Sequence, residues 1–220
     1  GGLFLNMSQL PMSSDPFKFQ KALLIVLIGI IAAVAIPKAM KPDAGLLKFK
    51  VSGDTAYGYG FTTGRSLDDF KKFRRENPGV RTLVLSKMSG TQDGVTNTKI
   101  ARLIRKEGLN THLEENSWIA SGAVDLFIAG AQRTMECGAI IGVHSWAYYA
   151  DEGMIKGPST HPGNLGSDPH QRRHERFLSD MGVDPAFYVF TREASPPEDL
   201  YYLKPEEIKR YGLLTAQKCE

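Results

Sequence analysis

The chain is poor in cysteine and has no excess of charge of one sign. Its 220 residues include two cysteines, 27 basic and 24 acidic residues, which leave a formal net charge of +3. Cys137 and Cys219 form no C-x-x-C pair and no zinc-ligand spacing, so they fit either a disulfide or two inert thiols, and the redox compartment stays open. Because no basic patch alternates with aromatic residues, a nucleic-acid partner is not expected.

The sequence also lacks internal repeats and low-complexity segments, which excludes solenoid architectures. An apolar content of 42% over this length is enough for one domain of medium size and an appendage.

One long hydrophobic run stands near the N-terminus. Residues 22–36 are uncharged and apolar, and Lys21 and Lys38 bracket them. The run is shorter than the ~20 residues of a full membrane span, but flanking lysines can extend such a helix. It also fits the hydrophobic region of a secretory signal, with Ala33–Ala35 as a cleavage site. We therefore predict a transmembrane or signal-anchor helix at residues 21–38.

This helix divides the chain into four segments. Residues 1–20 are predicted to be a flexible tail, residues 39–50 a linker, and residues 51–220 the folded domain. Lysines are more frequent after the helix than before it, which mildly favours a cytoplasmic C-terminal domain.

Strand and helix patterns alternate through the folded domain. Apolar β-branched runs predict strands, and amphipathic stretches ended by glycine or proline predict helices. This alternation is typical of an α/β fold with right-handed crossovers. The predicted strands are 46–51, 55–61, 80–86, 111–113, 133–135, 139–143 and 187–190; the predicted helices are 66–76, 95–107, 121–130, 169–181 and 203–211. Glycine-rich residues 88–94 and 148–168 are predicted loops.

A serine and a histidine occupy the ends of neighbouring predicted elements. Ser121, followed by Gly122, opens a small apolar helix, and His144 ends an apolar strand. A hydroxyl at a helix N-terminus lies among backbone N–H groups that can hold an oxyanion, and a histidine nearby can act as its base. Singly, Ser121 is more readily an N-cap and His144 a core histidine. Together they predict nucleophilic catalysis.

Other polar residues allow further interpretations. Asp125 shares a helix face with Ser121, and we expect it to form an ion pair with Arg133; orientation of the histidine is the alternative. A serine–lysine dyad would need Lys87 or Lys99, neither of which is better placed than His144.

The histidines outside this pair could in principle bind a metal. His170 and His174 are four residues apart on a predicted helix, downstream of His161. Their neighbours are mostly charged, which favours a solvated face, so we predict no metal and no cofactor. Trp146 could line a groove or pack in the core.

The order of these elements resembles a known family. A buried strand at 83–86 precedes a glycine loop; Ala120-Ser-Gly-Ala then opens an apolar helix, and a later strand ends in Val143-His144. This order resembles the proteolytic subunit of Clp protease within the ClpP/crotonase superfamily, and most closely the exported or membrane-associated ClpP-like serine proteases predicted in bacteria. The resemblance covers residues 50–214. It implies ββα repeats, a mostly parallel sheet packed by helices.

The resemblance also assigns roles to residues. It implies Ser121 as nucleophile, His144 as general base, and Gly122 and Gly90 as backbone oxyanion donors, with Gly94 as a weaker match for the second donor. The family's acid precedes a Leu-x-x-x-Glu ending that Leu203–Leu213 matches, so Asp199 fits best, with Glu198 beside it. The family's Ser-Pro-Gly-Gly loop is replaced here by a loop without adjacent glycines.

The activity implied is that of a membrane-tethered serine hydrolase acting on peptides or proteins. Two alternatives remain: a non-catalytic ClpP-like module that assembles or binds a partner at the membrane, and a crotonase-type acyl-CoA enzyme. The resemblance further implies a homo-oligomer at the bacterial inner membrane, single-pass, with its domain in the periplasm, against the lysine bias. The sequence has no ATPase motif, so any unfoldase would be a separate protein.

Overall fold

The computed structural model describes residues 46–150, 153–156 and 169–216. All of them lie within one unit of the chain, which begins at Pro42. The predicted tail and anchor, and most of the linker, fall outside the described residues, as does much of the predicted loop at 148–168. Within the described ranges, no helix has the length and apolar character needed to cross a membrane.

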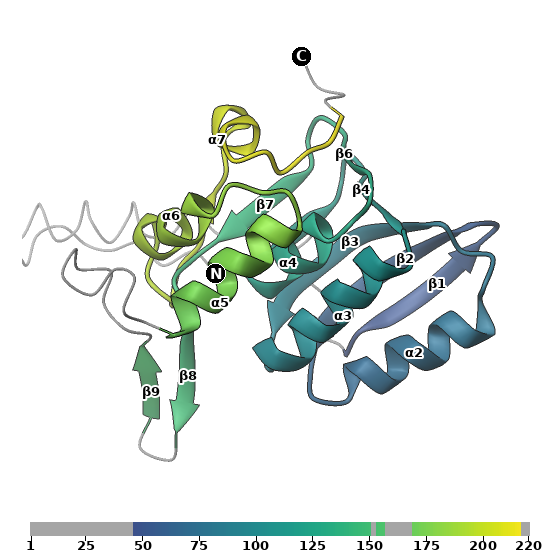
Figure 1. Ribbon diagram of the computed structural model, residues 1–220, viewed down its shortest axis with the longest axis horizontal. Helices are drawn as coiled ribbons and strands as arrows, with labels where there is room; N and C mark the ends of the chain where they lie inside the picture. The colour runs from purple at the N-terminus through teal and green to yellow at the C-terminus, as the bar shows by residue number, and fades with distance from the viewer. Residues whose placement is uncertain (1–45, 151–152, 157–168, 217–220) are drawn as a thin grey trace, which may run out of the picture. The chain divides into compact units, whose positions relative to one another are not determined.

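A mostly parallel sheet organises the described part of the chain (Figure 1). Its main path runs β1-β2-β3-β5-β7-β10, with antiparallel pairing only at the two ends, between β1 and β2 and between β7 and β10. The strands are β1 (Lys48–Ser52), β2 (Thr55–Thr62), β3 (Thr82–Thr91), β4 (Asn110–Leu113), β5 (Trp118–Ala120), β6 (Arg133–Met135), β7 (Ile140–Val143) and β10 (Tyr201–Tyr202).

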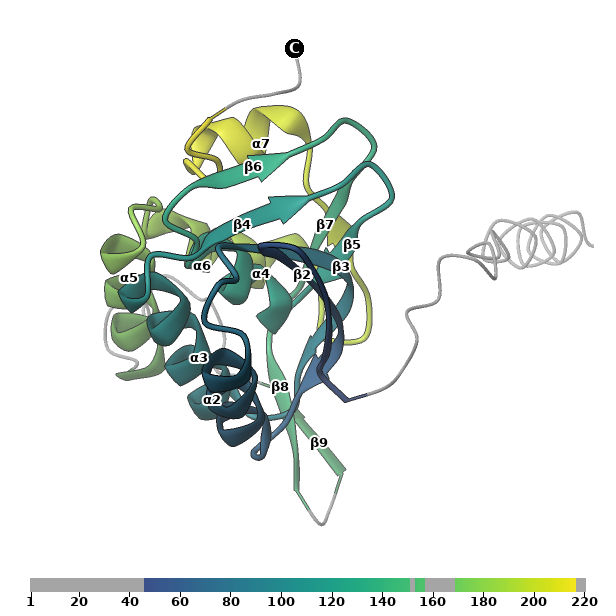
Figure 2. The same cartoon turned by 90° about the vertical axis from the view of Figure 1, so that its right-hand side faces the viewer.

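Strand β3 is long enough to serve two arms of the sheet. Its first residues, Thr82–Val84, pair with β4, and β4 continues to β6. Its later residues, Lys87 and Met88, pair instead with β5, which continues to β7. Figure 2 shows the two arms diverging from β3.

Helices pack against the sheet, and one of them contacts both of its arms. They are α2 (Ser66–Glu76), α3 (Gly94–Lys106), α4 (Gly122–Ile128), α5 (Pro169–Asp180), α6 (Ala186–Ala194) and α7 (Pro205–Arg210). Helix α4 contacts α3 and strands of both arms, β4 as well as β5 and β7. Strands β8 (Ala147–Ala150) and β9 (Gly153–Lys156) form a separate hairpin that extends away from the sheet (Figures 1 and 2).

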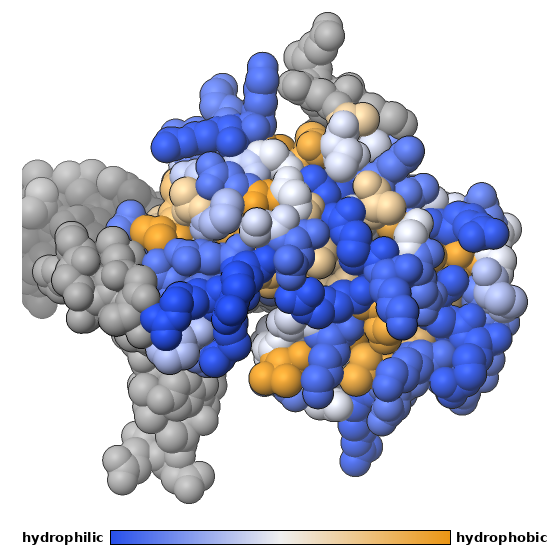
Figure 3. Space-filling view, in the orientation of Figure 1, coloured by the Kyte–Doolittle hydropathy of each residue, from blue (hydrophilic) through white to orange (hydrophobic). Residues whose placement is uncertain are grey.

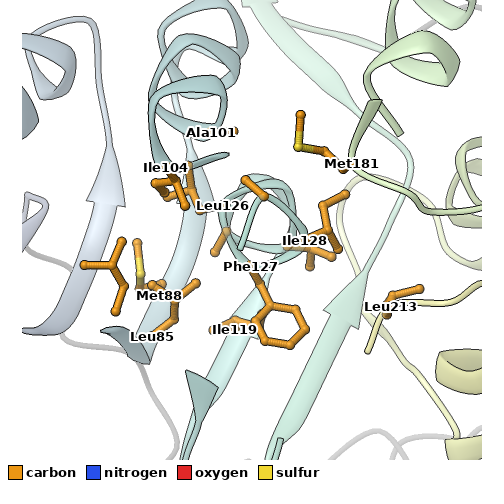
Figure 4. Packing of buried hydrophobic residues seen from close by; sticks show 14 of the residues in the cluster. Leu85, Met88, Ala101, Ile104, Ile119, Leu126, Phe127, Ile128, Met181 and Leu213 are labelled. Carbon is orange, nitrogen blue, oxygen red and sulfur yellow. The ribbon is translucent and has the colours of Figure 1, made fainter. Parts of the chain in front are cut away.

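The composition of α4 explains its central position. Every residue of the helix except Asp125 is buried, as expected of a helix that is apolar on all sides. Phe127 is completely buried and lies close to Ile119 and the core residues of β3 in Figure 4. Burial of one such aromatic side chain stabilises a fold by about 1.5–3 kcal/mol. Packing against both arms of the sheet thus holds the helix in place.

A glycine lets the end of α4 approach the second arm. A Cβ atom added to Gly130 would lie 2.8 Å from the backbone nitrogen of Thr111 and 2.9 Å from the carbonyl oxygen of Gln132. The Thr111 hydroxyl donates to the carbonyl of Phe127 over 2.6 Å. A larger residue would separate α4 from β4.

One sequence prediction was wrong in the type of element. Residues 187–190, predicted as a buried strand, belong to helix α6. Their aromatic rings pack at helical spacing, with Phe187 and Phe190 both against Tyr211, at centroid distances of 5.3 and 5.1 Å. A short apolar run fits a strand or a buried helix equally well, and here the packing against Tyr211 favours the helix.

Three further differences concern strands that are longer than predicted or that were not predicted. Strand β3 continues to Thr91 and absorbs half of the predicted glycine loop. The three residues of β5 were not predicted as a strand. Backbone pairing between Ala147 and Lys156 forms a hairpin within the predicted loop at 148–168.

Candidate active site

Ser121 occupies a sharp turn between β5 and α4. Its φ and ψ are 54° and −130°, and among the described residues it alone has a positive φ without being glycine. Such a backbone is rare and strained for a residue with a side chain. Ser121 takes the N-cap position, yet its side chain makes no capping hydrogen bond. The N-cap role alone therefore does not account for the serine.

Backbone hydrogen bonds hold this turn in place. The N–H of Ser121 donates to the carbonyl of Gly142 on β7 over 3.0 Å, and its own carbonyl accepts from Val124 over 2.9 Å. The buried side chain of Asn97 donates to the carbonyl of Gly122 over 2.8 Å. Thr62 in turn donates to Asn97 over 2.9 Å. The turn is thus bonded to β7, α3 and β2, which can sustain the strained conformation.

Gly90 lies directly against Ser121. A Cβ atom added to Gly90 would be 2.9 Å from Cβ and 3.2 Å from Oγ of Ser121, and its φ is +127°, which other residues rarely adopt. An added Cβ at Gly94, the weaker candidate, would meet nothing within 4 Å. Of the two loop glycines, the structure brings Gly90 to the serine.

His144 follows the carboxyl end of the neighbouring strand. Ala120 pairs with Gly142 in parallel register, so the chain beyond β5 and the chain beyond β7 emerge side by side. Nδ1 of His144 is buried and has no hydrogen-bond partner among the described residues. Burial lowers the pKa of His144, and an interaction with the backbone of Ser145 offsets only part of this effect. The imidazole is therefore favoured in its neutral form.

A cavity of about 430 Å³ brings these groups together. Ser121, Gly122 and His144 all line it. Much of its remaining wall is apolar or aromatic, as in many small-molecule and peptide sites. These apolar lining residues are Val95, Val124, Val143, Trp146, Phe177, Phe187 and Tyr188.

Asp199 stands apart from this group. Its side chain is exposed, and Oδ1 accepts a hydrogen bond from the N–H of Leu200 over 2.8 Å. The segment that carries it does run beside the end of β7, because Tyr201 pairs with Val143 and the N–H of Ser145 donates to the carbonyl of Ser195. Backbone on either side of Asp199 thus pairs with the segment around His144, and no hydrogen bond joins the two side chains among the described contacts.

The predicted ion pair between Asp125 and Arg133 is wrong. Arg133 is buried and donates instead to main-chain carbonyls, including those of Leu213 at 2.8 Å and Met181 at 2.9 Å. Burial and the nearby charge of Arg105 lower its pKa to about 10. Asp125 points away from this cluster and into the cavity.

The partner of Asp125 is His174 of α5. Oδ1 of Asp125 lies 3.3 Å from Nε2 of His174, and the two side chains are 18% and 31% exposed. The His174 ring lies against Tyr188 at a centroid distance of 4.9 Å. Burial alone would lower the pKa of His174, but the charge and hydrogen bond of Asp125, with the charge of Glu175, raise it.

The solvated face predicted for this helix is therefore wrong at His174, which is partly buried, whereas His170 is exposed as predicted. His170 also lines the cavity, with its ring 5.0 Å from that of Trp146. The missed signal was the spacing of His170, His174 and Phe177, which places them on one face of α5. Among the described residues, no group of three or more potential metal ligands gathers.

Comparisons with known proteins agree on the fold. No protein-family model and no curated sequence matches the chain. Two solved structures of the 1510-N membrane-bound stomatin-specific protease are similar to it. The serine-to-alanine variant has 13% identity and a TM-score of 0.50 and covers 78% of this chain and 82% of its own. A lysine-to-alanine variant with a substrate peptide has 14% identity and a TM-score of 0.51 and covers 78% of each chain.

These two structures show that the chain shares the fold of this protease. ClpP1 of Listeria monocytogenes is a more distant match, with 14% identity, a TM-score of 0.48 and coverage of 76% of this chain and 92% of its own. The predicted mostly parallel sheet packed by helices is confirmed by the structure itself. Within this fold, the β5–α4 turn and the end of β7 form the candidate site.

The Asp125–His174 pair predicts a pH-dependent contribution to stability. Because the folded-state pKa of His174 is raised, the pair stabilises the fold fully below the unfolded pKa of about 6.5, and this stabilisation is lost as pH rises through the folded value. We expect His174→Gln to unfold in urea with about 1 kcal/mol less stability at acidic pH and with little difference in alkaline buffer. Asp125→Asn should show the same trend. A constant difference across pH would contradict this assignment.

Proposed function

We propose that this chain is a membrane-tethered serine hydrolase that cleaves peptides, with Ser121 as nucleophile and His144 as general base. The observation that carries the proposal is the strained, uncapped Ser121 in one cavity with a histidine whose pKa is lowered. Strained turns that expose a nucleophile at a strand–helix junction recur in hydrolases. The structural similarity to a membrane-bound protease also supports a peptidase.

In the proposed reaction, neutral His144 accepts the Ser121 proton as Oγ attacks the peptide carbonyl. The oxyanion that forms is held by the N–H of Gly122, which as the first residue of α4 has no acceptor within the helix. Backbone of Gly90, which lies against Ser121, supplies the second donor. His144 then returns the proton to the leaving amine, and water completes the hydrolysis by the reverse sequence.

Asp199 is proposed as the acid that orients His144. The unpartnered Nδ1 of His144 needs an acceptor when the ring gains a proton. Asp199, or Glu198 beside it, lies on the segment bonded alongside β7, and a side-chain rotation away from Leu200 would be required.

The alternatives account for fewer of these features. Neither a non-catalytic module nor an acyl-CoA enzyme requires a strained backbone at Ser121 or a neutral His144. A serine–lysine pair is suggested by the lysine variant of the similar protease. Lys99 lines the cavity but is exposed, whereas a lysine base needs burial to lose its proton at neutral pH.

Labelling by an alkyl fluorophosphonate tests the nucleophile. We expect the wild-type chain to become covalently labelled and Ser121→Ala to lose labelling completely. His144→Ala should be labelled at least about 100-fold more slowly, because the base is removed. Ser179→Ala, at an exposed position of α5, is the matched control and should label as wild type. Absence of labelling of the folded chain would favour the non-catalytic module.

The pH dependence of this labelling identifies the base. Because burial lowers the pKa of His144, the rate should fall on acidification with a midpoint below about 6.5. His174→Gln should leave that midpoint in place. A midpoint above the usual histidine value that disappears in His174→Gln would instead assign the base to His174, whose pKa is raised. Circular dichroism at each pH confirms that the chain stays folded.

Membrane attachment through residues 21–38 and a periplasmic domain complete the proposal. Cys137 is disulfide-bonded, and structural disulfides persist in oxidising compartments such as the periplasm. The hydrophobic run at 22–36 supplies the anchor.

Fractionation of bacteria that express the chain tests this attachment. We expect the chain in the membrane fraction, release on deletion of residues 21–38, and digestion of the domain when protease is added to spheroplasts. Protection of the domain would place it in the cytoplasm. Light scattering of the detergent-extracted chain measures the expected homo-oligomer, which a monomer mass would contradict.

A further inference from the structure

The cavity at Ser121 is lined by more positive than negative charge. Among its described lining residues are four basic side chains, Lys99, Arg102, Arg173 and Arg192, and one carboxylate, that of Asp125. Basic residues come from both α3 and α5. These helices meet where Arg102 pairs with Asp180 at 2.9 Å.

Most of these charges already have partners. Asp125 faces His174 at 3.3 Å, so the one carboxylate has a partner within the cavity. Arg102 is offset by Asp180. The Arg192 guanidinium lies over the ring of Trp146, 5.6 Å from its centroid, and that stacking fixes its position.

Lys99 and Arg173 carry the remaining charge. Both side chains belong to exposed residues, and neither forms an ion pair within 4 Å in the described part of the chain, although the charge of Lys99 also acts on Asp93 at the start of α3. A low-dielectric cavity whose rim carries one sign of charge concentrates ligands of the opposite sign. The rim therefore favours an anionic ligand over a neutral one of the same shape.

The same rim offers an apolar contact. Val95, in the first turn of α3, is 67% exposed and lines the cavity beside Lys99. Figure 3 shows apolar surface over the exposed end of α3, surrounded by hydrophilic residues. An extended peptide can place an apolar side chain on Val95 and carboxylates beside the two cations, whereas a small anion would use only the charges.

We propose that the cavity selects acidic peptides, whose Glu or Asp side chains on either side of the bond at Ser121 are held by Lys99 of α3 and Arg173 of α5. This selectivity rests on the proposed function, because it takes the cavity as the peptide site. It assigns the two exposed cations to substrate choice and leaves the chemical step to Ser121 and His144.

Peptide binding to the full-length Ser121→Ala chain tests the selectivity without turnover. Three fluorescein-labelled peptides of equal length, built from Ala-Leu-X repeats with X as Glu, Gln or Lys, are compared by fluorescence anisotropy. We expect the Glu peptide to bind at least about tenfold more tightly than the Gln peptide, and the Lys peptide to bind weakest. The Glu advantage should shrink as salt rises above ~0.1 M.

A matched pair of double variants locates the effect. Lys99→Gln with Arg173→Gln should reduce the ratio of Glu-peptide to Gln-peptide affinity about tenfold. Lys71→Gln with Arg75→Gln removes the same charge from exposed positions of α2, outside the cavity lining, and should leave that ratio unchanged. Equal affinities for the Glu and Gln peptides, or an equal loss in both double variants, would overturn the proposal.

The result also separates this proposal from the proposed hydrolase. Fluorophosphonate labelling of Ser121 without a Glu preference would overturn the selectivity and leave the hydrolase intact. A Glu preference without labelling would support the selectivity and contradict the hydrolase, leaving an acidic-peptide binding module.

Discussion

The burial of α4 between the two arms of the sheet is the constraint on which the site depends. Because the helix is apolar on almost every side, it can be accommodated only where β3 splits its pairing between β4 and β5. Its start is bonded to Gly142 through the Ser121 N–H, and its end is held against Thr111. With both ends fixed, the chain has to turn sharply at Ser121. The strain at that residue is a consequence of core packing that the surrounding hydrogen bonds sustain.

The same packing sets the electrostatics of the cavity. His144 leaves β7 into a partly desolvated position, which favours its neutral form. One turn into α4, Asp125 is the only residue of the helix that is not buried, and it meets His174 across the cavity. Two histidines in one cavity thus have their pKa values moved in opposite directions. Groups whose environments push their pKa values apart are typical of sites with distinct acid and base roles.

Much of this arrangement could be predicted from the sequence, and the failures have physical causes. The helix patterns predicted α2, α3 and α5 close to their true bounds, and the resemblance predicted the fold that the comparisons confirm. The short run at 187–190 was misread because a four-residue apolar segment has no period of its own. The roles of Ser121, Gly122, His144, Gly90 and Asp199 remain predictions. The structure brings Ser121, Gly122 and His144 to one cavity, places Gly90 against Ser121, and leaves Asp199 exposed.

The sequence by itself determined most of the helices and strands, and that a serine opens one element and a histidine ends another, because side-chain periodicity and element order are local properties. Only the tertiary structure decided the partners of the charged groups. Arg133 donates to main-chain carbonyls, and Asp125 pairs with His174. The rotation of α4 and the packing of α5 set which of these side chains meet. Contacts between residues far apart in the chain follow from packing, and no local pattern encodes them.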